Sequence, residues 1–335
     1  MSATDPAGVP ARKAPDSLID LRLVFVTGKG GVGKTTVAAA LAQLAAQRGK
    51  RVLACEVDAK GDLAALFEAA PTDFAGREVS PGVVAMSMDT EASLREYLRM
   101  FLRVPVATRL GPLAKVFDFV ATAAPGVREI LTVGKLCYEA RERRYDLIVV
   151  DAPASGHIVS QLAAPQAINE LVKVGLIRTQ TDWMLDILSD PRRTGVVVVT
   201  TPEEMPVTET LEVSARIETE TTVRLSAVVV NRVLPELFGR HEEEVFERLY
   251  AGRAELSKDT GGDVDPIMEG ARLAVTMRRT RAGHLQRLRE GLKELEGSQG
   301  SVEVPVLYVP YLFTRAHGLR TTGQVATALS EELGL

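Results

Sequence analysis

The stretch "VTGKGGVGKTT", residues 26–36, decides the fold. It contains the pattern G-x-x-x-x-G-K-[ST], with Gly28, Gly33, Lys34 and Thr35 at the required positions. An apolar run precedes the pattern and an alanine-rich segment follows it, which predicts strand, loop and helix in that order. Backbone N–H groups at such a helix start point toward an anion, so the pattern predicts a loop that binds nucleotide phosphates.

Each residue type in this loop has a chemical reason. Glycines let the backbone approach the phosphates closely. Lys34 would contact the β and γ phosphates as a catalytic cation, and the Thr35 hydroxyl would ligate Mg²⁺. The predicted nucleotide-binding residues of the loop are Gly28, Lys29, Gly30, Gly31, Val32, Gly33, Lys34, Thr35 and Thr36.

Two aspartates follow apolar runs and are candidates for the chemistry. Asp151 in "LIVVDAPASGH" is the predicted second magnesium ligand, acting through water. Asp58 in "ACEVDAKGDL" is predicted to lie on the same carboxyl edge of the sheet, where a doubly wound fold places its ligand. There it would orient or deprotonate the attacking water. The alternative is that Asp58 only caps the next helix.

Short β-branched or apolar runs recur along the chain, as expected of strands covered on both faces. They span residues 21–27, 51–57, 83–88, 145–151, 194–201, 225–231 and 304–310. Helix-length segments lie between them, most clearly residues 35–48, which Gly49 ends. This alternation predicts an α/β fold, a doubly wound, mostly parallel sheet flanked by helices.

Two long helix-compatible stretches, about 91–143 and 158–193, interrupt this rhythm. They flank the strand at 145–151, so we expect them to meet as an inserted α-helical subdomain. Residues 262–296 also predict a long helix whose leucines pack on the sheet rather than form a coiled-coil arm. These leucines are Leu285, Leu288, Leu292 and Leu295.

The composition narrows the class of protein. With 335 residues, 46% hydrophobic and 25% charged, the chain is typical of a soluble globular protein. The net charge of −4 gives no general affinity for nucleic acid or acidic membranes. No run approaches the ~18 apolar residues of a membrane span. Residues 1–19 lack the apolar segment of a signal peptide, so we expect a flexible tail and a cytoplasmic protein.

"GKGGVGKTT" resembles the deviant Walker A sequence of the MinD, ParA, nitrogenase iron protein and ArsA group of dimeric ATPases. In that group the early lysine, here Lys29, crosses the dimer interface to the partner's nucleotide. The resemblance therefore implies that Lys29 is a catalytic cation acting in trans. The residues alone predict that Lys29 points toward water or a partner, because a second cation beside Lys34 would be repelled.

Within this group the chain is most similar to the ArsA family, which includes arsenite-pump ATPases and ATPases that target tail-anchored membrane proteins. The family's first switch resembles "DAKGDLAALF" (58–67), which keeps Asp58, Leu63 and Phe67. Ala59 replaces the family's proline and Asp62 its asparagine. The resemblance implies that residues 20–335 form one P-loop ATPase domain that binds ATP and Mg²⁺.

Other segments extend the resemblance over about residues 21–335. The second switch resembles "DAPASGHI" (151–158), with Gly156 and His157 matching and Ser155 preserving a hydroxyl. "VVVNR" puts Asn231 where the family reads adenine. "VPYLFTRAHGL" (309–319) resembles the closing strand and nucleotide loop, which adds Pro310 to the predicted nucleotide site.

The two cysteines limit what the protein acts on. Arsenite binding in this family uses a cysteine triad, and the tail-anchored-protein ATPases hold zinc with paired cysteines. Cys55 and Cys137 supply neither, and their positions in a strand and a helical run predict core residues. The chain also has one phosphate loop where arsenite pumps have two ATPase halves, so arsenite export is not expected.

Two apolar segments, 97–106 and 171–188, have two interpretations. They either pack inside the helical subdomain or form an exposed groove for an apolar helical client.

These observations predict a Mg²⁺-dependent ATPase of the ArsA family that works as a nucleotide-gated dimer coupled to an unidentified client. Its partner is either a second copy or a paralogous ATPase. The alternative is a positioning switch like MinD or ParA, although the C-terminal segment 323–335 has no cationic face for a membrane. An electron-transfer iron protein would need two cysteines per subunit at the dimer axis. No nucleic-acid partner and no integral membrane segment are expected.

Overall fold

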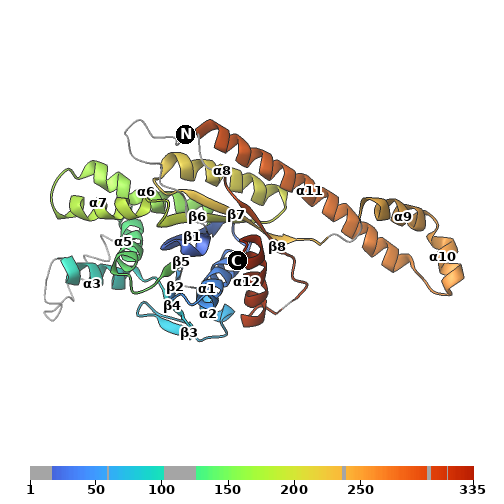
Figure 1. Ribbon diagram of the computed structural model, residues 1–335, viewed down its shortest axis with the longest axis horizontal. Helices are drawn as coiled ribbons and strands as arrows, with labels where there is room; N and C mark the ends of the chain where they lie inside the picture. The colour runs from blue at the N-terminus through green and yellow to red at the C-terminus, as the bar shows by residue number, and fades with distance from the viewer. Residues whose placement is uncertain (1–16, 59, 102–125, 236–238, 300–302, 315) are drawn as a thin grey trace.

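The computed structural model describes residues 17–58, 60–101, 126–235, 239–299, 303–314 and 316–335 (Figure 1). Its centre is an eight-stranded sheet with the strand order β3-β4-β2-β5-β1-β6-β7-β8. Neighbouring strands are parallel except β3 and β4. The strands are β1 (Leu23–Gly28), β2 (Val52–Glu56), β3 (Arg77–Ser80), β4 (Val83–Ser87), β5 (Leu147–Asp151), β6 (Thr194–Thr200), β7 (Leu225–Val233) and β8 (Val306–Pro310).

This sheet confirms the predicted α/β fold and the seven predicted strands. Strand β3 was not predicted, because its residues are exposed or half-buried and show no apolar run. Such a strand carries little of the hydrophobic pattern on which prediction depends. It pairs antiparallel at the edge of the sheet, away from the phosphate loop.

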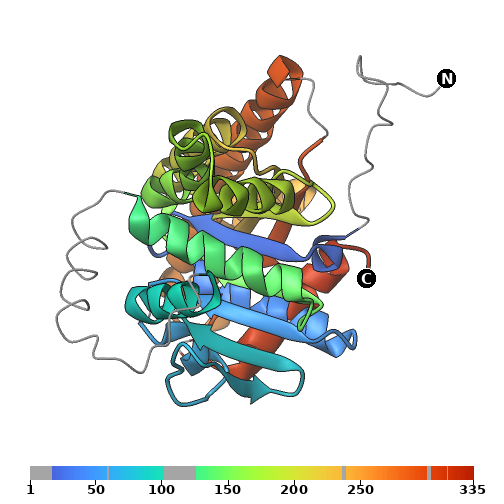
Figure 2. The same cartoon turned by 90° about the vertical axis from the view of Figure 1, so that its left-hand side faces the viewer.

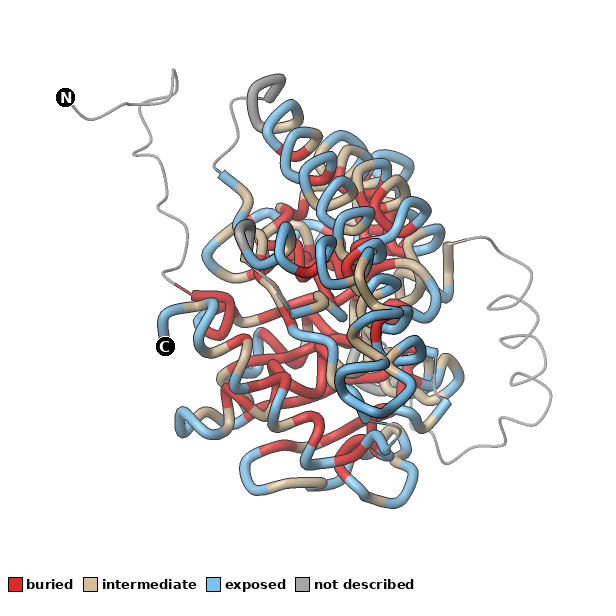
Figure 3. The backbone as a smooth tube through the Cα atoms, turned by 90° about the vertical axis from the view of Figure 1, so that its right-hand side faces the viewer, coloured by how far each residue is buried: buried red, intermediate tan, exposed pale blue. Residues whose placement is uncertain are grey.

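Alternate side chains of each strand enter two separate cores, which makes the molecule three-layered (Figure 2). In β1, for example, Val24 lies in one core and Phe25 in the other. The first core is covered by η1 (Leu18–Asp20), α1 (Lys34–Gln47), α2 (Asp62–Leu66) and α12 (Leu319–Glu332). The second is covered by α5 (Val127–Glu142), α6 (Ser155–Leu171), α7 (Leu176–Leu188), α8 (Glu204–Glu220) and α11 (Asp265–Gln299). Figure 3 shows the strands as the buried centre of the chain.

Four helices at one end of the molecule pack against one another: α3 (Thr90–Phe101), α5, α6 and α7 (Figure 1). They occupy the two stretches for which helices were predicted, and residues 102–125 between α3 and α5 lie outside the described part of the chain. Because α5, α6 and α7 also contact the sheet, these helices are continuous with its second core. The division into a domain and a subdomain stays a prediction.

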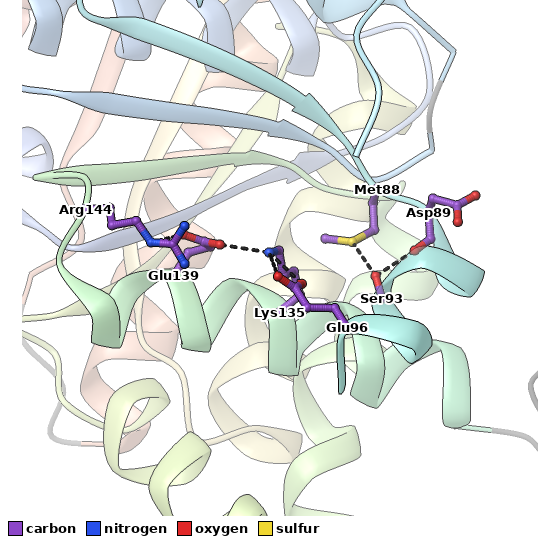
Figure 4. Close-up of polar contacts among 7 residues, drawn as sticks. All are labelled: Met88, Asp89, Ser93, Glu96, Lys135, Glu139 and Arg144. Atoms are coloured by element: carbon purple, nitrogen blue, oxygen red, sulfur yellow. Dashed lines mark hydrogen bonds and ion pairs between the residues drawn. The ribbon is translucent and has the colours of Figure 1, made fainter. Parts of the chain in front are cut away.

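A buried ion network fastens α3 to α5 (Figure 4). The Lys135 side chain is 8% exposed, and its Nζ lies 2.7 Å from Oε2 of Glu96 and 2.8 Å from Oε1 of Glu139. The ammonium also lies 4.8 Å from the centre of the Phe74 ring. Arg144 approaches the second oxygen of Glu139 at 3.7 Å. These ion pairs therefore help to hold α3 against α5.

The long helix α11 has two different halves. Its C-terminal half buries Leu288 and Leu292 in the second core, which confirms the predicted packing. Its N-terminal half projects from the body together with α9 (Arg240–Ala251) and α10 (Arg253–Thr260), which the sequence analysis did not predict (Figure 1). A small separate core lies within this projection. In the described part of the chain, no helix combines the length and the apolar character needed to cross a bilayer.

We expect Lys135→Met to lower the free energy of unfolding by about 3 kcal/mol, because it removes the buried cation that pairs with the buried Glu139 and the half-buried Glu96. The matched control is Arg95→Met on α3, whose partner Glu91 is exposed. That loss should stay below about 1 kcal/mol. Urea denaturation of both variants measures the difference, and equal losses would show that the network adds nothing beyond a surface pair.

Candidate active site

The phosphate loop joins β1 to α1 at the carboxyl edge of the sheet. Gly28 has φ 146°, and a Cβ there would lie 2.1 Å from the carbonyl oxygen of Val199 on β6. Only glycine fits this close approach. Gly31 and Gly33 have φ of 85° and 97°, in the left-handed region, and Gly33 is the N-cap of α1. Glycine is suited to both of these conformations, and phosphate binding by the loop stays a prediction.

Asp151 lies at the end of β5, directly beside this loop and opposite Val26 of β1. Its side chain is 8% exposed, and its Oδ1 has no hydrogen-bond partner among the described residues. Burial raises the pKa of Asp151 to about 6, although the neighbouring Thr35 hydroxyl and the Lys34 ammonium lower it. An orphaned carboxylate oxygen beside a hydroxyl is a donor set that suits Mg²⁺, so these two residues fit the predicted metal.

Lys34 and Asp58 complete the charged centre. Burial lowers the pKa of the Lys34 ammonium, while the carboxylates of Asp151 and Asp58 raise it. Lys34 Nζ donates to the carbonyl oxygen of Lys29 at 3.4 Å. Asp58 is exposed, one residue beyond Val57 and near enough to raise the pKa of Asp151. The structure thus brings the two predicted aspartates and the loop lysine together.

The alternative that Asp58 only caps the next helix is wrong, because Gly61 is the N-cap of α2. The amides of Gly61 and Asp62 donate instead to the carboxylate of Glu56, at 2.9 and 3.0 Å. The Asp62 side chain is exposed.

Lys29 pairs with a carboxylate of its own subunit. Its Nζ forms a salt bridge with Glu209 of α8, and about a third of each side chain is exposed. The other oxygen of Glu209 accepts from the Ser155 hydroxyl at 3.4 Å. From the sequence, Lys29 was expected to face only water or a partner subunit. Its pairing with Glu209 was not predicted, because Glu209 lies 180 residues away in a helix without a recognisable motif.

The second switch begins α6 beside this contact. Ser155 is the first residue of the helix, and Gly156 and His157 are exposed. The Thr27 hydroxyl at the end of β1 donates to the carbonyl oxygen of Pro153 at 2.8 Å. This bond ties the second switch to the strand that carries the phosphate loop.

Asn231, near the C-terminal end of β7, supports the phosphate loop through a hydrogen bond. Its Nδ2 donates to the carbonyl oxygen of Val32 at 2.9 Å, and its Oδ1 accepts from the amide of Arg232. A Cβ at Gly33 would lie 2.3 Å from Nδ2, so the glycine makes room for this amide. Pro310 ends the neighbouring strand β8 and is exposed. The adenine contacts of Asn231 and Pro310 stay a prediction.

Both cysteines lie in the second core. Cys55 and Cys137 are free and fully buried, and burial raises the pKa of both thiols, that of Cys137 to about 12. This confirms the prediction that they are core residues.

With this geometry established, comparison with known proteins identifies the family. The family model described as "Anion-transporting ATPase", the ArsA family, matches residues 21–182 and 177–249. The chain belongs to the ArsA family. As a member of it, the protein is an ATPase, and its reaction is the hydrolysis of ATP.

Named relatives of this ArsA-family ATPase come from several organisms. The ATPase BagA of Mycobacterium tuberculosis is 35% identical over 246 residues, 70% of this chain and 72% of that protein. The arsenical pump-driving ATPase of Acidiphilium multivorum is 27% identical over 71% of this chain and 45% of its own length. The ATPase ASNA1 homolog of Entamoeba dispar is 26% identical over 64% and 77%.

The raised pKa of Asp151 predicts a pH-dependent effect of Asp151→Asn in the nucleotide-free ATPase. Because the pKa of Asp151 is higher in the folded than in the unfolded protein, this group stabilises the folded state below about pH 4. That contribution is lost as the pH rises through about 6. The ionised carboxylate therefore costs roughly 3 kcal/mol at pH 8. Asp151→Asn should raise the melting temperature by several degrees at pH 8 and have little effect near pH 4.

Scanning calorimetry at both pH values measures this difference. Asp259→Asn is the control, because that carboxylate is exposed on α10, in the projection away from Asp151. A shift of Asp151→Asn that is the same at pH 4 and pH 8 would contradict the electrostatic explanation.

Proposed function

We propose that this ATPase is Mg²⁺-dependent and works as a nucleotide-gated dimer coupled to a client protein. The observation that carries the proposal is the buried Asp151 carboxylate beside Thr35 and the phosphate loop, with one oxygen unpartnered among the described residues. A divalent cation arriving with the nucleotide would relieve the cost of burying this charge.

The loop residues hold the triphosphate. Lys34 and the N–H groups at the start of α1 bind the phosphate oxygens, and Asn231 keeps the loop in shape through Val32. Thr35 and Asp151 would hold Mg²⁺, which neutralises phosphate charge when bound. Asp58 orients or deprotonates the attacking water from the exposed end of β2.

Lys29 has to leave Glu209 in order to reach a partner's nucleotide. The pair is partly exposed, so it contributes no more than about 1 kcal/mol. The triphosphate of the partner subunit carries more negative charge than one carboxylate and would compete successfully for the ammonium. A weak pair in the single subunit is therefore compatible with a lysine that acts in trans.

Part of the apolar segment 171–188 supports a client with an apolar helix. Leu171 and Val174 are 81% and 82% exposed where α6 meets α7, and Ile177 is also exposed. Met184 and Leu188 are buried in the second core, so the packing interpretation holds for the end of the segment. Of the other segment, residues 102–106 lie outside the described part of the chain. An exposed apolar turn is suited to a helical partner.

Arsenite is not the client we propose, because the only two cysteines are buried in the core with thiol pKa values raised. The match to the ArsA-family model favours an ArsA-type ATPase over a positioning switch like MinD or ParA. We place the protein in the cytoplasm, as a homodimer or a heterodimer with a paralogous ATPase.

Lys34→Ala should abolish ATP binding, because it removes the cation that faces the phosphates. Calorimetric titration with Mg-ATP measures the affinity, and Lys173→Ala, at an exposed position after α6, is the control of equal charge change. Unchanged affinity in Lys34→Ala would refute the site.

Lys29→Ala should bind ATP and hydrolyse it slowly, and Asp58→Asn should do the same, with turnover slower by ~10²-fold. If Lys29 acts in trans, a mixed dimer of the two variants has one site with both defects and one with neither. Turnover should then partly recover on mixing. Native mass measurement establishes that mixed dimers form, and mixed dimers without recovered activity would place the action of Lys29 within its own subunit.

A further inference from the structure

Glu56 is a buried carboxylate in an otherwise apolar strand. It ends β2, "VLACE", and is 3% exposed. In the sheet it lies opposite Asp151 of β5 on one side and Ser87 of β4 on the other. A carboxylate in such a position is costly unless hydrogen bonds compensate for the lost water. The groups that satisfy Glu56 therefore indicate what it does.

Both oxygens of Glu56 are used by the loop that carries Asp58. Oε2 accepts from the Gly61 amide at 2.9 Å, and Oε1 accepts from the Asp62 amide at 3.0 Å. Gly61 has φ 80°, a left-handed conformation that lets two successive N–H groups converge on one anion. The chain leaves β2 after Glu56. It then returns to the Glu56 side chain, which accepts hydrogen bonds from the amides of residues 61 and 62. Asp58 lies inside this closed loop.

The backbone around Glu56 is fixed on both sides. Its carbonyl oxygen accepts from the Met88 amide at 2.8 Å, and the next amide, of Val57, donates to the carbonyl oxygen of Asp151 at 3.1 Å. Met88 in turn accepts a contact from Ser93 of α3 through its sulfur at 3.3 Å (Figure 4). The carboxylate is therefore held on a rigid part of the sheet, which is what a precise positioning group requires.

Asp58 itself has no such support. It is exposed, and no hydrogen bond or ion pair to its carboxylate is found among the described residues. The backbone beyond it is the part that Glu56 holds, at Gly61 and Asp62.

We propose that Glu56 is a positioning residue for ATP hydrolysis, which sets the place of the Asp58 carboxylate by fastening the backbone at Gly61 and Asp62 to the end of β2. This inference rests on the proposed role of Asp58 toward the attacking water. Both Glu56 oxygens are occupied by backbone amides, so the proposal assigns it no contact with the nucleotide or the attacking water. It acts through the loop, and a residue that merely stabilised α2 would affect the melting temperature without affecting turnover at saturating ATP.

A double-mutant cycle tests the proposal. In Glu56→Gln one amide oxygen remains, but the side-chain NH₂ faces a backbone N–H and cannot accept from it. Turnover of Glu56→Gln at saturating ATP should fall about 10-fold, with KM for ATP changed less than about 3-fold, because misplacement near the reacting atoms is costly. In the Asp58→Asn background the same change should alter turnover by less than about 2-fold.

Gly61→Ala opens the same loop by a different route, because alanine is strained at φ 80°. Its matched control is Gly49→Ala after α1, which has the same φ of 80° and, like Gly61, no atom close enough to clash with a Cβ. Both variants should lose similar melting temperature, but only Gly61→Ala should lose turnover, and again only when Asp58 is present. The pair keeps the test valid if Glu56→Gln does not fold.

The outcomes are distinct. The positioning role is overturned if Glu56→Gln and Gly61→Ala fold and keep full turnover. It is also overturned if either change reduces turnover by the same factor with Asp58→Asn present as without it. Both results leave the Asp58 proposal intact. Full turnover in Asp58→Asn alone overturns the proposed role of Asp58, and the inference falls with it.

Discussion

The buried charge at the carboxyl ends of β2 and β5 is the constraint on which the site depends. Asp151 and Glu56 lie opposite one another in adjacent strands, both inside the protein. Burial raises the pKa of Asp151, and the neighbouring Glu56 carboxylate raises it further. The two carboxylates differ in how their burial is compensated. Glu56 is satisfied by two amides of the chain, whereas Asp151 keeps an oxygen unpartnered among the described residues, suited to a cation that comes with the substrate.

The same edge of the sheet connects the site with the helices at the end of the molecule. The carbonyl oxygen of Glu56 binds the Met88 amide, and the chain enters α3 two residues later. Lys135 then holds α3 to α5 through Glu96 (Figure 4). Breaking the pair would leave the buried Lys135 with one partner fewer, so this contact favours keeping α3 against α5. This is a continuous set of contacts from the Asp58 loop to the helices nearest the exposed apolar turn.

The fold was predictable because the residue pattern that marks each of the seven strands and the phosphate loop lies within a short stretch of sequence. Gly28, Gly33, Lys34, Thr35 and Asp151 were predictable for the same reason, since each is defined by neighbours in sequence. What the sequence did not reveal depends on contacts between distant segments. Glu209 meets Lys29 across 180 residues, and the partners of Glu56 are backbone amides, which leave no trace in the side-chain pattern. The projection of α9 and α10 has only a small core and therefore a weak signal.

Burial distinguishes the carboxylates around the loop by how firmly each is held. Glu56 is almost fully buried and has two amide donors, so releasing it would leave a charge in the interior with nothing to replace them. Glu209 is about a third exposed, so water can replace Lys29 or Ser155 at little cost. Its two oxygens nevertheless bind the phosphate loop and the second switch at once. A rotation of Glu209 away from Lys29 would also change its contact with Ser155, so this one carboxylate links the phosphate loop to the second switch.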